Sequence, residues 1–383
     1  MALMAFTLNA QTMKTLTWAN QERQYLEYVP SNYSEGTPTP VLFMLHGLGD
    51  NATDFFNGTS IRSMAESKGW IVVCPQALDF NVQIPGLGSY PFGTAWSAGI
   101  TVPVQFELYG MPFDFDVTVN PDADDSGFLM ATLATLEEQY NLNQDSVFFA
   151  GFSLGACMSH RMAIDHGDRI NAIAAVSGVV GNDMADMTPT GNVKVLEIFG
   201  TSDGTISYEE ALISLQTLGN YNIGLPAEAT VEYWRAFNQC AEEPVIEAYP
   251  DTQNDGLTFE KYSYLDGENN TRVDFIKVNN GLHSWYTGNI NDIDYTEEII
   301  KFFTHPINTT EVSEQAENTL SVYPNPASDF ILVDAKEEAK IFDLCGKLVL
   351  QSQGESKIDI TSLPNGMYFV KQGDACSKLM INK

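Results

Sequence analysis

The chain has 383 residues, 44% of them hydrophobic, which is enough for one large domain with a substantial core and a smaller unit. Fifty acidic residues against 19 basic ones give a net charge of −31, which argues against nucleic acid, anionic membrane surfaces and polyanionic substrates. A neutral or insoluble substrate is easier to accommodate. Because no apolar run approaches the roughly 18 to 20 residues that cross a bilayer, we expect no membrane span.

Residues 1–17 have two open interpretations. The short apolar stretch from Ala2 to Ala10 is typical of the end of an export signal, although it has no basic start. The alternative is a frayed N-terminal strand that leads into the first domain.

Residues 18–305 alternate β-rich runs with helical patterns, which is typical of an α/β fold with a mainly parallel sheet and helices on both faces. Strands are expected within residues 24–30, 40–50, 70–76, 146–151, 170–178, 193–200 and 272–278. Helices are expected at 124–141 and 295–305, where apolar residues recur at helical spacing. The sequence therefore predicts one large α/β domain over 18–305.

The composition changes after this domain. Residues 306–320 are polar and aperiodic, which predicts a linker. Residues 321–383 contain short β-rich runs separated by Gly, Pro and Asn turns. They predict a small, independent antiparallel β-sandwich.

A single serine stands between two glycines where the predicted strand 146–151 meets a helix. The pattern is Gly151-Phe152-Ser153-Leu154-Gly155. Glycines on either side allow a sharp turn that holds the serine hydroxyl above the sheet, at a helix N-terminus that favours negative charge. We therefore predict that Ser153 is a nucleophile rather than an incidental turn residue.

A nucleophilic serine needs a histidine base that follows it in the chain, after a later strand. Of the five histidines, His46 precedes the serine, His160 and His166 belong to the next helix, and His305 lies beyond the last one. His283, in a turn directly after the strand 272–278, remains as the predicted base.

The carboxylate that orients the base should follow the strand 193–200. Asp203 stands there, in Gly-Thr-Ser-Asp-Gly; a turn-forming role is its alternative. The oxyanion would be bound by the backbone N–H groups of Leu154 and Leu48, the second in the loop LHGLGD. We expect His46 to pack under that loop as a structural residue.

Two acidic segments resemble the start of a calcium loop. Residues 121–127 lack the required glutamate at the twelfth position, which is Leu133, and residues 251–256 have Tyr262 there. Helix capping explains the first segment better. We predict no metal and no cofactor.

The five cysteines show no metal-binding spacing. Cys74 and Cys157 are expected to be small buried hydrophobic residues. Cys240 with an unknown partner, and Cys345 with Cys376, could form disulfides in an exported protein, and the sequence leaves this open.

Seven stretches carry a family resemblance. In chain order they are LHGLGDNATDF, TAWSAG, DADDSGFL, GFSLGACMSHRMA, GTSDGTISY, EYWRAFNQC and GLHSWY. This order is similar to that of secreted polyhydroxybutyrate depolymerase-like and feruloyl esterase-like serine esterases, relatives of carbohydrate esterase family 1, over residues 30–305. The resemblance implies an α/β-hydrolase fold with Ser153, Asp203 and His283 as the triad. The loop NGLHSWYTG departs from the family pattern at the pocket rim. The resemblance therefore defines the mechanism more closely than the substrate.

The tail has a second resemblance. VYPNPASDFI, IFDLCGK and LPNGMYFVK resemble the C-terminal sorting domain of proteins exported by the type IX secretion system. The resemblance implies that the secretion machinery is a partner of the tail, and it favours the export-signal interpretation of residues 1–17. A secreted or cell-surface location follows.

These observations predict an extracellular serine esterase that forms an acyl-enzyme on a polyester or a feruloyl-polysaccharide. Trp96 and Trp285 are expected to line the acyl or leaving-group pocket, with core packing as the alternative for Trp96. Residues 220–256 are expected to decide the substrate. The competing hypothesis is a non-catalytic surface-binding protein on a hydrolase scaffold.

Overall fold

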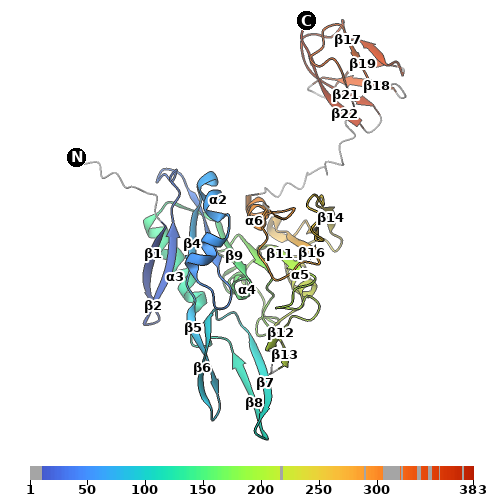
Figure 1. Ribbon diagram of the computed structural model, residues 1–383. Helices are drawn as coiled ribbons and strands as arrows, with labels where there is room; N and C mark the ends of the chain where they lie inside the picture. The colour runs from blue at the N-terminus through green and yellow to red at the C-terminus, as the bar shows by residue number, and fades with distance from the viewer. Residues whose placement is uncertain are drawn as a thin grey trace, which may run out of the picture. The chain divides into compact units, whose positions relative to one another are not determined.

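The computed structural model describes residues 11–383 except 216–218, 289, 305–319, 321, 334–337, 344–346, 353 and 373–374. The chain divides into two compact units, residues 1–307 and 308–383 (Figure 1). Each unit has its own hydrophobic core. The predicted linker falls almost entirely outside the described residues.

The large unit is built on one ten-stranded sheet. In spatial order its strands are β1 (Thr12–Trp18), β2 (Gln21–Tyr28), β4 (Ile71–Pro75), β3 (Thr39–Leu45), β9 (Leu142–Phe152), β10 (Ala172–Val176), β11 (Lys194–Gly200), β16 (Val273–Asn279), β15 (Thr258–Tyr264) and β14 (Val245–Ala248). The six strands from β4 to β16 in this order are parallel, and antiparallel pairs are added at both edges. This confirms the predicted mainly parallel sheet.

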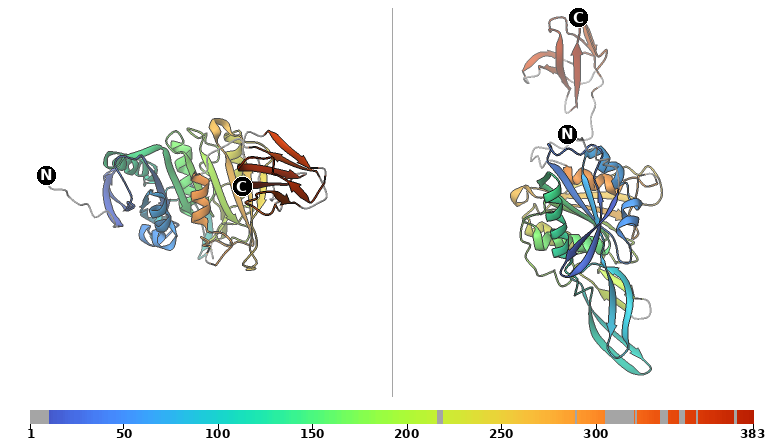
Figure 2. Two further views of the ribbon diagram at one scale, coloured as in Figure 1. Left: turned by 90° about the horizontal axis from the view of Figure 1, so that it is seen from above. Right: turned by 90° about the vertical axis from the view of Figure 1, so that its left-hand side faces the viewer.

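Helices cover both faces of the sheet (Figure 2). On one face lie α1 (Ala52–Gly58), α2 (Ile61–Lys68) and α6 (Tyr295–Thr304), and on the other α3 (Asp125–Gln139), α4 (Leu154–His166) and α5 (Ala227–Phe237). A 3-10 turn, η1, spans Glu268–Asn270. Every residue of β4 and β10 is buried, because strands covered on both faces become continuous apolar runs.

Helix α3 begins as the capping interpretation predicted. The side chain of Asp124 accepts a hydrogen bond from the Gly127 N–H (2.9 Å), which is an N-cap. Asp125 is fully buried and pairs with Arg23 at 2.5 Å. Within the described residues no group of His, Cys, Asp or Glu side chains could hold a metal ion.

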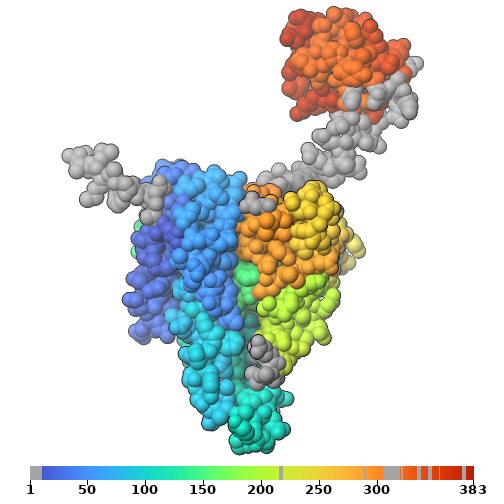
Figure 3. Space-filling view, in the orientation of Figure 1, coloured from blue at the N-terminus to red at the C-terminus, as the bar shows by residue number. Residues whose placement is uncertain are grey.

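Two long β-hairpins project from the α/β core (Figures 1, 2 and 3). The first consists of β5 (Leu78–Ile84) and β6 (Gly88–Ala95), and the second of β7 (Thr101–Leu108) and β8 (Met111–Thr118). We refer to residues 78–95 and 101–118 as the hairpin pair. A short hairpin of β12 (Leu212–Leu215) and β13 (Gly219–Asn222) contacts β7. The sequence analysis did not predict these hairpins.

Two expectations about chain segments change. Residues 12–17, which the prediction placed in the N-terminal lead, belong to the edge strand β1, so the sheet starts before residue 18, and the alternative of an N-terminal strand fits them. The segment 220–256 contains helix α5, which packs on the sheet, and the edge strand β14. No helix among the described residues is long and apolar enough to span a bilayer.

The small unit consists of two antiparallel sheets. The four-stranded sheet contains β19 (Leu348–Ser352), β18 (Ala339–Phe342), β21 (Gly366–Gln372) and β22 (Ala375–Ile381), and the two-stranded sheet contains β17 (Phe330–Leu332) and β20 (Lys357–Asp359). Its core includes Ile341, Val370 and Leu379, all fully buried. These sheets agree with the predicted small antiparallel β domain.

The cysteines whose side chains are described are free thiols. Cys74, Cys157 and Cys240 are all buried, as expected for the first two. The possible pair Cys345–Cys376 lies outside the described residues and side chains.

Candidate active site

The predicted site residues lie at one edge of the sheet. Leu48 follows β3, Ser153 follows β9, Asp203 follows β11, and His283 follows β16. Since these four strands are parallel, their carboxyl ends meet at the same edge, where α/β folds bind ligands.

Ser153 occupies a strained turn between β9 and α4. Its backbone has φ 56° and ψ −122°, a conformation that side-chain-bearing residues rarely adopt. A Cβ at Gly151 would lie 2.1 Å from the Gly155 carbonyl oxygen, and a Cβ at Gly155 would lie 2.1 Å from the Leu45 carbonyl oxygen. Both glycines are therefore required by close backbone approach, as the Gly-x-Ser-x-Gly pattern predicted.

Asp203 and His283 form a direct hydrogen-bonded pair. The Nδ1 atom of His283 lies 2.7 Å from Oδ2 of Asp203, whose side chain is fully buried. The other carboxylate oxygen, Oδ1, accepts the backbone N–H groups of Thr205 (2.8 Å) and Ile206 (2.9 Å). Asp203 thus combines the turn-forming and the histidine-orienting roles, and Nε2 of His283 is left for a reacting group.

The loops that carry this pair are packed against each other without side chains between them. A Cβ at Gly200 would lie 2.3 Å from the Gly281 carbonyl oxygen. The Ser202 N–H donates to the same oxygen (2.9 Å), and the Leu282 N–H donates to the Tyr286 hydroxyl (2.8 Å). These contacts fix the distance between the two loops.

The loop after β3 approaches the serine directly. A Cβ at Gly47 would lie 3.4 Å from Cβ of Ser153. His46, fully buried, supports this loop: its Nδ1 lies 2.8 Å from the Gly47 carbonyl oxygen, and its Nε2 accepts the Ala77 N–H (3.1 Å). Burial lowers the pKa of His46, so the ring is a neutral structural group, as expected.

Ser153, His283, Leu48 and Leu154 line one cavity of about 850 Å³. Most of its lining is apolar, and the hairpin pair contributes ten of the apolar residues. The lining residues from this pair are Phe80, Val82, Ile84, Tyr90, Phe92, Val102, Val104, Phe106, Phe115 and Val117. The segment 220–256, expected to decide the substrate, contributes Ile223.

The two predicted pocket tryptophans lie elsewhere. Trp96 is fully buried in the core, and its indole N–H donates to the His46 carbonyl oxygen (2.8 Å). Trp285 packs edge-on against Phe55 and Phe152, and Phe152 in turn lies 4.8 Å from the His283 ring, centroid to centroid. Neither indole is among the described residues that line the cavity, so both support the site from behind.

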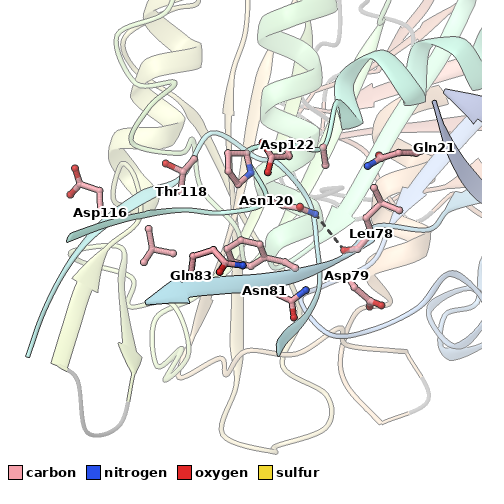
Figure 4. Close-up of a pocket in the computed structure, with 13 residues that line it drawn as sticks. Gln21, Leu78, Asp79, Asn81, Gln83, Asp116, Thr118, Asn120 and Asp122 are labelled. Atoms are coloured by element: carbon pink, nitrogen blue, oxygen red, sulfur yellow. Dashed lines mark hydrogen bonds between the residues drawn. The ribbon is translucent and has the colours of Figure 1, made fainter. Parts of the chain in front are cut away.

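A second hollow, of about 450 Å³, lies on the outer side of β5 and β8 (Figure 4). Its lining is mixed, and its polar residues include Asn81, Gln83 and Asp116. None of the predicted site residues lines it, and its lining combines residues of β5 and β8 with Gln21 and residues 120–123.

A buried polar cluster joins α4, β11 and α5 beneath the site. The indole N–H of Trp234 donates to Nδ1 of His160 (3.0 Å), and Nε2 of His160 lies 3.1 Å from Oε2 of Glu197. Because Nδ1 accepts a hydrogen bond, His160 is neutral with its proton on Nε2. Burial lowers the pKa of His160 to about 3 and raises that of Glu197 well above its ordinary value.

Several esterases are similar in sequence to this chain. The chain is 26% identical over 258 residues to NocK of Nocardia uniformis subsp. tsuyamanensis, assigned as an esterase, covering 65% of this chain and 66% of that protein. It is 26% identical over 201 residues to feruloyl esterase D of Neurospora crassa, covering 52% of this chain and 59% of that protein. The chain therefore spans less than two thirds of the length of these relatives.

Among solved structures, an acetyl xylan esterase from Aspergillus awamori is similar, with a TM-score of 0.47 and 14% identity; the match covers 76% of this chain and 98% of that one.

Two families match separate parts of the chain. Residues 321–382 match the secretion system C-terminal sorting domain, which confirms the predicted secreted or cell-surface location. Residues 32–223, half of the chain, match the family described as phospholipase/carboxylesterase. This match includes Ser153 and Asp203 and ends before His283. The chain belongs to the phospholipase/carboxylesterase family.

Proposed function

We propose that the protein is a serine hydrolase of carboxylic esters, with Ser153 as nucleophile, His283 as base and Asp203 as orienting acid. The observation that carries the proposal is the 2.7 Å hydrogen bond from His283 to the buried Asp203, at a cavity that Ser153 and His283 line together. The strained backbone of Ser153 supports the same assignment.

The reaction has two halves. Ser153 Oγ attacks the ester carbonyl carbon while Nε2 of His283 takes its proton, and the backbone N–H groups of Leu48 and Leu154 bind the oxyanion. The carbon–oxygen bond to the alcohol then breaks, and His283 returns the proton to the leaving alcohol. Water attacks the acyl-enzyme by the same route and releases the acid and the free serine.

The proposed substrates are neutral or insoluble esters outside the cell, either polyesters or feruloyl-polysaccharides. The net charge of −31 disfavours polyanionic substrates, and the curated relatives include a feruloyl esterase. The tail would engage the secretion machinery. A non-catalytic binding protein would have no need of the Asp203–His283 pair or of the strained serine.

The test is hydrolysis of p-nitrophenyl acetate, methyl ferulate and a polyhydroxybutyrate film by the full chain, with Ser153→Ala as the comparison. The expected result is hydrolysis of at least one substrate, reduced by about 10⁴-fold or more in the variant. Equal rates in both proteins would contradict the proposal. Equal adsorption to the film without hydrolysis by either protein would support the binding hypothesis instead.

A further inference from the structure

Three strands of the hairpin pair, β5, β7 and β8, alternate between exposed residues and more buried ones. In β7, Val102 and Val104 are buried, whereas Pro103, Gln105 and Glu107 are exposed. In β5, Phe80, Val82 and Ile84 are more buried and alternate with exposed residues. The exposed residues are Asp79, Asn81 and Gln83, which Figure 4 labels. A strand with alternating burial has one face packed against a partner.

The apolar faces of the two hairpins line the cavity that contains Ser153 rather than closing on each other completely. Val82 and Phe92 line it from the first hairpin, and Val104 and Phe115 from the second. Tyr90 and Phe92 also line it and are 47% and 39% exposed, so the cavity reaches the surface at that hairpin. It is therefore an apolar slot that leads from the surface to the serine.

We propose that this slot binds the aliphatic acyl chain of a neutral ester and that the hairpin pair sets the chain-length specificity. This inference rests on the proposed function and adds the chemical class of its acyl group. A slot of about 850 Å³ with two apolar walls stabilises each methylene group that it removes from water, whereas an acetyl group would leave most of it unfilled.

The acyl part, rather than the alcohol, is assigned to the slot because of the first hairpin's attachment. The Gly49 N–H donates to the Thr94 carbonyl oxygen (2.8 Å), and the Thr94 hydroxyl donates to the Asp50 carbonyl oxygen (2.6 Å). The first hairpin, which forms one wall of the slot, is thus attached to the loop whose Leu48 N–H would bind the acyl carbonyl oxygen. The leaving alcohol must instead stay beside Nε2 of His283, which protonates it.

The charge of the hairpin pair selects a neutral substrate. Its outward positions carry exposed carboxylates at Asp79, Glu107, Asp114 and Asp116. These like charges repel a fatty acid anion or an anionic lipid headgroup near the slot. A neutral aliphatic ester meets no such penalty.

The first experiment measures kcat/KM of the full chain on p-nitrophenyl acetate, butanoate, octanoate and dodecanoate, and on methyl ferulate. We expect a rise of about fourfold per added methylene up to octanoate, and at least on the order of 100-fold in total. Preference for acetate, or for ferulate over octanoate, would overturn the inference. Either result would still be compatible with the proposed serine hydrolase function, because that proposal depends only on the loss of activity in Ser153→Ala.

The second experiment fills the slot. Val104→Trp places an indole in it, and Gln105→Trp places the same group on the exposed face of the same strand. The ratio of kcat/KM for dodecanoate to that for butanoate should fall at least about tenfold in Val104→Trp and stay unchanged in Gln105→Trp. Val82→Trp, with Gln83→Trp as its separate control, repeats the comparison on the other hairpin in case Val104→Trp does not fold. Unchanged ratios in folded variants of both walls would overturn the inference.

The third experiment distinguishes the acyl from the alcohol side by comparing ethyl dodecanoate with dodecyl acetate. The long acyl chain should be hydrolysed with at least about tenfold higher kcat/KM. Preference for dodecyl acetate would place the alcohol in the slot and overturn the assignment.

Discussion

Asp203 has a structural role in its turn and, in the proposed triad, a chemical one. One carboxylate oxygen accepts two backbone N–H groups and closes the turn, while the other faces the histidine. An Asp203→Asn substitution would separate the two roles. Its amide oxygen can still accept the backbone N–H groups of the turn, whereas its N–H₂ group cannot accept the imidazole N–H of His283.

Asp203→Asn should therefore abolish most activity without unfolding the chain. The amide N–H₂ group would favour the tautomer of His283 with its proton on Nε2, which cannot accept the serine proton. We expect kcat on p-nitrophenyl acetate to fall by about 10⁴-fold with little change in Tm. Asp186→Asn, an exposed aspartate in a loop, is the matched control. Retention of more than a tenth of the activity would contradict the assignment of Asp203.

Glu197 presents the opposite situation, a buried acid outside the proposed triad. Burial raises its pKa, so the folded chain holds a proton that the unfolded chain releases above the ordinary pKa of about 4.3. Stability from this group is present at low pH and is lost as pH rises. Its Oε1 atom has no hydrogen-bond partner, which adds to the cost of ionisation.

Glu197→Gln should consequently stabilise the protein in a pH-dependent manner. The amide oxygen can still accept the His160 N–H, and there is no proton to lose. We expect Tm at pH 8 to rise by at least about 3 °C, with a smaller difference at pH 5. Thermal unfolding at both pH values tests this, with exposed Glu243→Gln as the control. A lower Tm at pH 8 would show that the ionised carboxylate stabilises the cluster.

At the scale of elements, the site depends on how closely β11 and β16 bring their following loops together. The contact of Gly200 with Gly281 involves backbone atoms alone, so the loops cannot adapt by changing a rotamer. The spacing of Asp203 and His283 is therefore set where the strands end.

Gly200→Ala should separate the loops, because its Cβ would lie 2.3 Å from the Gly281 carbonyl oxygen. A displacement near 1 Å between catalytic groups costs on the order of 100-fold, so we expect at least this loss in kcat, together with a lower Tm. Gly58→Ala, which has no atom within 4 Å of the new Cβ, is the control for adding a methyl group. Unchanged kcat would show that the loops tolerate the displacement.

The elements that were predictable from sequence have a strong local pattern. Buried parallel strands appear as continuous apolar runs, and residues at their carboxyl ends could be ordered into a candidate triad. The alternation in LDFNVQI and TVPVQFEL is also typical of strands, but a local pattern does not show that the inward faces of both hairpins line one cavity with Ser153. The positions of Trp96 and Trp285 were not predictable, because closeness to His283 along the chain does not fix the direction of an indole.

At the scale of the whole molecule, the two units differ in the core available to stabilise each. The small unit has a core of few residues, and a domain of about 60 residues buries only about 60% of its unfolded surface. We therefore propose that it unfolds independently of the α/β unit and that catalysis does not depend on it.

Ile341→Ala tests this independence. Ile341 is fully buried in the small unit, and its truncation should cost about 2–5 kcal/mol, a large part of the stability of so small a domain. Calorimetry of the full chain should show two transitions, of which Ile341→Ala lowers or removes one and leaves the other, and kcat/KM on a soluble ester, unchanged. Ile173→Ala, equally buried in β10, should move only the other transition. If either substitution moved both transitions, the two units would unfold together, and the secretion domain would contribute to the stability of the catalytic one.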